Sequence, residues 1–128
     1  PHKPYIASGD WITEDDKTGK ASSVVRLEFR DGELSGIITA LLVEGDGICD
    51  ACRGDKKDAP LIGMTILWGL RNSDDEPEIW NGGEVFDPDS GTTYKAKIEV
   101  IDAETLSMRA YIGLQFLGRT QLWKRKKE

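Results

Sequence analysis

The chain has 128 residues, of which 38% are hydrophobic and 31% are charged, so we predict a single globular domain over residues 1–128. The formal net charge is −6, which argues against nucleic-acid partners, because non-specific binding to nucleic acid needs a basic surface. No apolar run approaches the roughly 18 residues of a membrane-spanning helix, so we expect a protein that does not span a membrane.

Extended segments and polar turns alternate in the first third of the chain. Residues 1–8 are expected to be a loose lead-in to the segment that begins at residue 9. In residues 25–29 apolar side chains alternate with charged ones, which is typical of a strand with one buried face. Residues 31–32 are Asp-Gly, a pair favoured in tight hairpins. The sequence therefore predicts that residues 34–43 return as the next strand.

Residues 44–60 form a long polar loop that holds both cysteines of the chain, Cys49 and Cys52. The loop is rich in acidic residues, which disfavours a thiolate and hence a reactive site. A structural zinc site needs four ligands, and His2 is the only histidine, so no metal site is predicted. A local disulfide is the favoured interpretation and would imply an oxidising compartment. Free thiols and a thiol–disulfide redox role remain as alternatives.

The next segments are more apolar. Residues 62–70 carry the clearest stripe of alternating apolar side chains in the first half of the chain, and this stripe is expected to face the interior. Residues 78–86 are expected to form a weak pair of strands broken at residues 81–83, Asn-Gly-Gly. An Asp-Pro-Asp-Ser-Gly turn at residues 87–91 then leads into the last third of the chain.

Three alternating segments joined by short turns fill residues 92–125 and predict an antiparallel meander. Such sheets commonly remove their exposed edges by closing. The whole chain shows about eight strand-like segments and no long helical periodicity. We therefore predict an all-β fold, an up-and-down antiparallel β-barrel of about eight strands, with a β-sandwich as the main competitor.

No catalytic group stands out in the sequence. His2 lies in the lead-in, so a catalytic triad built on histidine is not expected. No pair of carboxylates is singled out by its spacing. The prediction is a protein that is not an enzyme and that carries no cofactor.

Two features at the ends of the chain carry a resemblance. Gly9-x-Trp11, followed by an arginine near the end of the last strand, resembles the barrel-closing device of the lipocalins and the wider calycin group, in which the arginine packs across the tryptophan ring. Arg119 and Arg125 are both candidates for this arginine, and the sequence does not choose between them.

A closer resemblance covers almost the whole chain. It is carried by Gly9-x-Trp11, Cys49-x-x-Cys52-x-Gly54, Trp80-x-Gly82-Gly83, Asp87-Pro88-x-x-Gly91 and Leu117-Gly118-Arg119-Thr120-x-x-Trp123, among other motifs. Their order and spacing are similar to those of the bacterial family catalogued as domain of unknown function 2147. Ala110 departs from the glycine expected before the tyrosine of one motif.

The resemblance implies a lipocalin-like barrel and an exported protein, in the periplasm or secreted. By analogy with that fold, we predict a non-catalytic barrel that binds a small hydrophobic or amphipathic ligand by burying its apolar surface. A packed barrel that serves as a protein-interaction module is the alternative, beside the redox role of the cysteines. The predicted lining of the cavity is Phe29, Ile66, Trp68, Tyr94, Met108 and Ile112.

Overall fold

The computed structural model describes residues 6–15, 18–43, 47–73, 75–113 and 118–127. These residues form eight β-strands and one short 3-10 helix, η1. The elements are β1 (Gly9–Glu14), β2 (Ala21–Arg30), β3 (Glu33–Leu41), η1 (Gly54–Lys56), β4 (Thr65–Ser73), β5 (Glu76–Asp87), β6 (Thr92–Asp102), β7 (Thr105–Tyr111) and β8 (Gly118–Arg125).

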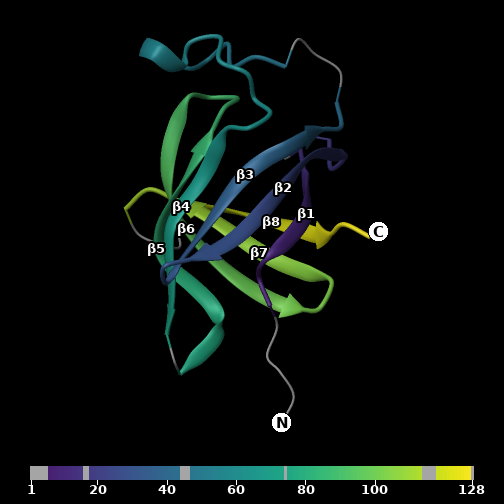
Figure 1. Cartoon of the computed structure of the whole chain (residues 1–128), viewed down its shortest axis with the longest axis vertical. Helices are drawn as coiled ribbons and strands as arrows, with labels where there is room; N and C mark the ends of the chain where they lie inside the picture. The colour runs from purple at the N-terminus through teal and green to yellow at the C-terminus, as the bar shows by residue number, and fades with distance from the viewer. Residues whose placement is uncertain (1–5, 16–17, 44–46, 74, 114–117, 128) are drawn as a thin grey trace.

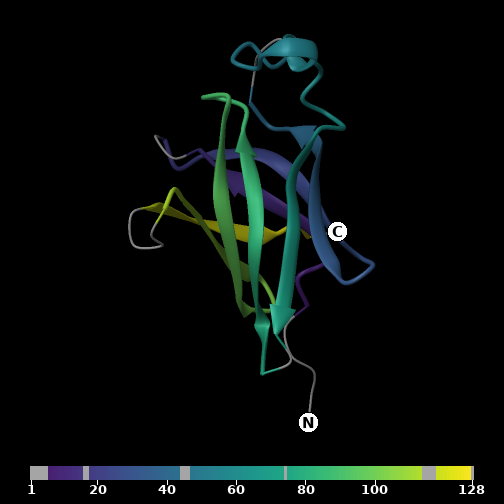
Figure 2. The same cartoon turned by 90° about the vertical axis from the view of Figure 1, so that its left-hand side faces the viewer.

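Each strand pairs antiparallel with the next strand in the sequence, and β8 returns to pair with β1. The result is a closed up-and-down barrel, as Figures 1 and 2 show. The fold class predicted from the alternating segments is confirmed. Closure pairs the first strand with the last, which is the physical advantage of a barrel over an open meander.

The final meander follows the predicted alternation of faces. Ala96, Ile98 and Val100 are buried on β6, and Leu106 and Met108 are buried on β7. The prediction for residues 78–86 was wrong, because these residues belong to one continuous strand, β5. The Asn-Gly-Gly segment produces a register shift between Trp80 and Gly83 in the pairing of β5 with β6, and not a turn.

The seam between β1 and β8 is short, with two residue pairs, Trp11 with Arg125 and Ile12 with Lys124. The Arg125 guanidinium lies 4.3 Å from the centre of the Trp11 ring, a distance at which a cation is attracted to the face of an indole. Its Nε donates a hydrogen bond to Ala103 O at 2.7 Å, and its two terminal nitrogens donate to Ser8 O and Ile6 O. Arg125 is therefore the barrel-closing arginine.

Arg119 does not contribute to this seam. It pairs with Ala110 at the other end of β8, and its guanidinium lies 5.7 Å from the Tyr94 ring. Its candidacy as a closing residue was wrong. Both arginines follow the same strand pattern, but only Arg125 lies opposite Trp11 when the barrel closes.

The residues just before β1 are held by the same contacts. The indole nitrogen of Trp11 donates to Ala7 O at 2.8 Å, and Ala7 is buried. Gly9 has a φ of +126°, and a side chain there would begin 2.7 Å from Arg125 Nη1, so glycine fits the first position of the Gly-x-Trp motif. Residues 6–8 are thus held by hydrogen bonds to their backbone carbonyls rather than loose, and residues 1–5 of the predicted lead-in lie outside the described residues.

An ion pair on the outer face lies between two residues that are opposite each other on β1 and β2. Arg26 Nε donates to Asp10 Oδ1 at 2.9 Å, and this hydrogen bond holds the pKa of Asp10 below its usual value. A depressed carboxyl pKa contributes stability above the ordinary pKa of aspartate, and that contribution is lost as the pH falls through the lowered value. Both side chains are solvent-exposed, so the contribution is small.

The hydrophobic core fills the end of the barrel that holds the β2–β3, β4–β5 and β6–β7 turns. The side chains there are almost completely buried and come from seven of the eight strands. They are Trp11, Val25, Leu27, Leu34, Leu67, Leu70, Trp80, Ile98, Val100 and Leu106. This end is solidly packed, as small eight-stranded barrels can be.

Replacing Arg125 with alanine should destabilise the protein by about 2 to 4 kcal/mol, because the change removes a cation–π contact and hydrogen bonds to three carbonyl groups. Denaturant unfolding followed by tryptophan fluorescence measures the effect. Arg125→Lys should recover only part of the loss, since an ammonium group cannot reach three carbonyls as a planar fork does. Arg119→Ala is the matched control and should cost less than about 1 kcal/mol; equal effects of the two alanine variants would contradict the assignment.

Candidate functional site

A cavity of about 490 Å³ opens at the end of the barrel opposite the packed core. Its lining includes residues from the β1–β2, β3–β4 and β5–β6 connections, which in an up-and-down barrel lie at the same end. Twenty-two residues line it: Thr13, Glu14, Asp15, Ser22, Ser23, Ile38, Leu41, Val43, Leu61, Ile66, Val85, Phe86, Asp87, Pro88, Asp89, Ser90, Tyr94, Met108, Ala110, Arg119, Gln121 and Trp123.

The inner wall is apolar. The residues of this wall are buried and come from four strands, β3, β4, β5 and β7, namely Ile38, Ile66, Val85, Met108 and Ala110. They occupy inward positions of their strands, further toward the open end than the packed core residues. A cavity of this size with such a wall can bury most of a small molecule, and apolar surface removed from water stabilises binding by about 25 cal/mol per Å².

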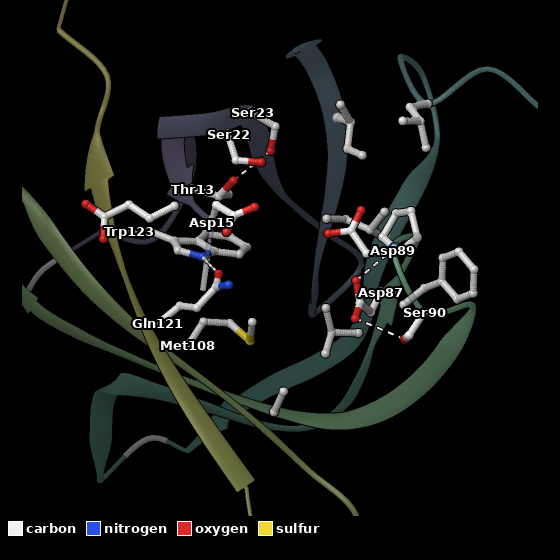
Figure 3. Close-up of a pocket in the computed structure, with 18 of the residues that line it drawn as sticks. Thr13, Asp15, Ser22, Ser23, Asp87, Asp89, Ser90, Met108, Gln121 and Trp123 are labelled. Carbon is white, nitrogen blue, oxygen red and sulfur yellow. Dashed lines mark hydrogen bonds between the residues drawn. The ribbon is translucent and has the colours of Figure 1, made fainter. Parts of the chain in front are cut away.

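Polar groups on one side of the cavity are bonded to one another. Thr13 Oγ1 and Ser23 Oγ lie 2.7 Å apart and are hydrogen-bonded, and both residues are buried. The indole nitrogen of Trp123 donates to Gln121 Oε1 at 2.8 Å. Figure 3 shows both pairs on the same side, next to Met108.

The opposite side carries the turn between β5 and β6, as Figure 3 shows. Asp87 Oδ1 accepts a hydrogen bond from the Asp89 backbone nitrogen at 3.1 Å, and Ser90 Oγ donates to Asp87 Oδ2 at 3.0 Å. Arg119 Nη2 lies 3.8 Å from the same Oδ2 atom. The turn is therefore ordered by its own side chains, and its carboxylates face the cavity.

Carboxylates outnumber cations around the opening. Glu14, Asp15, Asp87 and Asp89 line the cavity, and Arg119 is the one basic side chain among the described lining residues. The described lining residues therefore carry an excess of negative charge, in agreement with the net charge of the whole chain.

The loop between β3 and β4 covers the same turn from above. Cys49 and Cys52 form a disulfide with their Cα atoms 5.4 Å apart, so this part of the prediction is confirmed. Cys49 Sγ lies 3.8 Å from Pro88 O, and Gly91 packs so closely on Ala51 O that a side chain would clash. Figures 1 and 2 both place this loop, with η1, beside the β5–β6 turn.

The disulfide is shielded from solvent. Cys49 is 1% exposed and Cys52 is 3% exposed. Thiol–disulfide exchange requires a thiolate to reach one of the sulfur atoms, so burial favours a structural role for this bond over the redox alternative.

Three of the six residues predicted to line the cavity do so, namely Ile66, Tyr94 and Met108. Phe29 and Ile112 do not, and they are 57% and 61% exposed. The alternation along each strand predicts an inward side chain at both positions, but the two residues lie at or past the ends of their strands, outside the cavity. Phe29 packs edge-on against Trp80 at the closed end, and Ile112 lies just past the end of β7.

Trp68 was also predicted wrongly, for a different reason. The β3–β4 pairing has two register shifts, so that Leu34 and Gly36 face Leu70 and Leu67. The extra residues on β4 change which side chains point inward, and Leu67 and Leu70 are both buried although they are three positions apart. Trp68 instead pairs with the exposed Glu84, and its indole nitrogen donates to Glu84 Oε1 at 3.1 Å.

The polar lining residues were not predicted from the sequence, although its pattern contains a signal for them. Thr13 lies two positions after Trp11, and Ser23 lies two before Val25, so the period of a strand places both on the inner face. Gln121 and Trp123 share the inner face of β8 in the same way. Polar residues at inward positions near a strand end are the pattern to search for in a barrel with an open end.

Other kinds of site are not evident in the described part of the chain. No group of three or more histidine, cysteine or acidic side chains there is placed to hold a metal ion. Within the same residues, no helix has the length and apolar character needed to cross a membrane.

A closed eight-stranded antiparallel barrel with a cavity at one end defines a lipocalin-like protein. The chain belongs to a family of uncharacterised proteins conserved in bacteria, domain of unknown function 2147, whose profile matches residues 9–125. The resemblance drawn from the sequence motifs is thereby confirmed. No curated protein matches the sequence.

The fold is similar to that of a solved structure, protein HP1028 from the human pathogen Helicobacter pylori, which is described as belonging to the lipocalin family. The two chains are 16% identical, the TM-score is 0.85, and the match covers 98% of this chain and 86% of that chain. At this level of identity the likeness shows the shared fold alone.

Replacing both Cys49 and Cys52 with serine should lower the free energy of unfolding by about 2 kcal/mol, because the ring closed by the disulfide is short. The barrel should remain folded, since its core lies at the other end. Chemical denaturation and far-ultraviolet circular dichroism together measure the two expectations. Loss of the barrel signal in the variant would contradict a purely local role for the bond.

Proposed function

We propose that the protein binds a small hydrophobic or amphipathic molecule in this cavity and does not transform it chemically. The observation that carries the proposal is the cavity itself, in which an inner apolar wall, built from inward positions of β3, β4, β5 and β7, lies below a polar opening. Such a gradient suits a ligand whose apolar body is buried and whose polar group remains near the opening. The lipocalin-like fold supports the proposal by analogy.

The alternative of a solidly packed interaction module is less well supported. Only the end with the β2–β3 turn is filled by side chains, and the opposite end holds the cavity of about 490 Å³. A module that uses its outer surface alone does not require such a space.

We also propose that the protein works in an oxidising compartment, outside the bacterial cytoplasm. The disulfide between Cys49 and Cys52 supports this location, because disulfides persist in exported proteins and are rare in the cytosol. Thiol labelling of protein taken directly from fractionated cells tests the proposal, and labelled cysteines in the native fraction would contradict it.

Ligand binding is tested by titration with N-phenyl-1-naphthylamine, an uncharged dye that fluoresces in apolar surroundings. The protein should give a saturable signal with one site per chain. Ala110→Phe should weaken binding at least tenfold, because Ala110 is buried in the cavity wall and the ring would occupy the space of the ligand.

Leu122→Phe is the matched control, since Leu122 lies on the outer face of β8 and is 43% exposed. It should bind the dye as the unmodified protein does. Thermal unfolding checks that both variants are folded, and Ile66→Phe serves as a second cavity-filling change. Equal dye binding by the cavity variants and the control would refute the cavity as the site.

A further inference from the structure

We propose that Thr13 and Ser23 form a subsite for the polar group of the ligand, and that this group is an uncharged hydroxyl or carbonyl rather than a carboxylate. The inference rests on the proposed function and adds the chemical class of the ligand to it. The ligand is accordingly a neutral amphiphile, with an apolar body against the inner wall and one neutral oxygen at the hydroxyl pair.

The two hydroxyls occupy an unusual place in the barrel. Thr13 and Ser23 face each other directly in the β1–β2 register, one pair further along the inner face than Trp11 and Val25. Those two neighbours are completely buried and apolar. Thr13 and Ser23 are themselves only 7% and 8% exposed, so two polar groups have been placed in the cavity wall where apolar residues would pack at lower cost.

Their hydrogen bonding is incomplete without a ligand. Two hydroxyl groups carry two hydrogen atoms, and the single bond between Thr13 and Ser23 uses one of them. No other side-chain hydrogen bond involves either hydroxyl in the described part of the chain. One O–H donor and several lone pairs therefore have no side-chain partner among the described residues, and both residues line the cavity. A carbonyl oxygen can accept from this donor, and an alcohol can accept from it and donate back.

Gln121 adds a second polar contact on the same side. Its Oε1 atom accepts the hydrogen bond from Trp123, which fixes the amide so that its nitrogen, a donor, is turned away from the indole. Figure 3 shows Gln121 below Thr13 along the cavity wall. The hydroxyl pair and this amide are all uncharged, so the polar groups on this side of the cavity are neutral.

A carboxylate on the ligand would also accept these hydrogen bonds, but the acidic residues at the opening disfavour the binding of an anion. Such an anion must pass and then remain near Glu14, Asp15, Asp87 and Asp89. Arg119 is the cation of the described lining, and its guanidinium already lies 3.8 Å from Asp87 Oδ2. Like charges repel, and the effect is larger where protein excludes water.

An ammonium group is disfavoured for another reason. The carboxylates line the opening, whereas the subsite at Thr13 and Ser23 is a pair of neutral hydroxyls. A cation buried there would lose its hydration without gaining an ionic partner. The hydroxyl pair therefore selects a neutral group, and the opening rejects an anion.

The test uses three probes with the same ten-carbon chain, namely 1-decanol, decanoate and decylammonium, each displacing N-phenyl-1-naphthylamine at pH 7.5 and low ionic strength. 1-Decanol should bind at least tenfold more tightly than decanoate and more tightly than decylammonium. Added salt should reduce the difference in affinity between 1-decanol and decanoate, because salt screens the carboxylates at the opening.

The double variant Thr13→Val with Ser23→Ala isolates the subsite. It should bind 1-decanol at least fivefold more weakly and bind the dye unchanged, because the apolar wall remains intact. Ser35→Ala is the matched control, since Ser35 lies on the outward face of β3 and is not among the residues that line the cavity. It should leave both affinities unchanged. Thr13→Ser provides a conservative variant that keeps the hydroxyl and should retain 1-decanol binding.

The outcomes separate this inference from the proposed function. If the protein binds the dye but takes 1-decanol and decanoate equally, or if the double variant binds 1-decanol as well as the unmodified protein, the subsite is refuted and the cavity function stands. Tighter binding of decylammonium than of 1-decanol would also overturn the neutral assignment. If neither the dye nor any probe binds, the proposed function itself fails.

Discussion

The barrel depends on the contact between Trp11 and Arg125. A sheet of eight strands closes only if its first and last strands meet, and here they share just two residue pairs. The guanidinium of Arg125 reinforces this short seam by covering the Trp11 ring and by donating to three backbone carbonyls, two before β1 and one in the β6–β7 turn. Because a planar fork can make these bonds at once, one side chain joins the two ends of the chain to the core.

Closure at that end leaves the other end free for a different use. The same inward rows of side chains that are large and fully buried around Trp11 become smaller or more polar toward the opening, as Ala110, Thr13 and Ser23 show. A single chain thereby has a packed half, which supplies stability, and a hollow half, which supplies a site. This division into a packed half and a hollow half explains how a small barrel can contain a cavity and still keep a hydrophobic core.

The disulfide loop belongs to the hollow half. It contacts the β5–β6 turn through Cys49 and Ala51, and this turn carries the carboxylates Asp87 and Asp89 that face the cavity. The closed ring of Cys49–Cys52 therefore acts on the shape of the opening and not on the barrel core.

The sequence by itself determined the fold class, because a period of two residues and short turns leave few arrangements other than an antiparallel meander that closes. It also determined the candidates for the seam and the disulfide. Tertiary structure decided which arginine closes the barrel, since only Arg125 lies opposite Trp11. It also decided which inward residues reach the cavity. Periodicity indicates the face of the sheet on which a side chain lies but not its height along the barrel, which is why Phe29 and Ile112 were wrongly assigned to the cavity. The register shifts of β4 change the face itself, which is why Trp68 points outward.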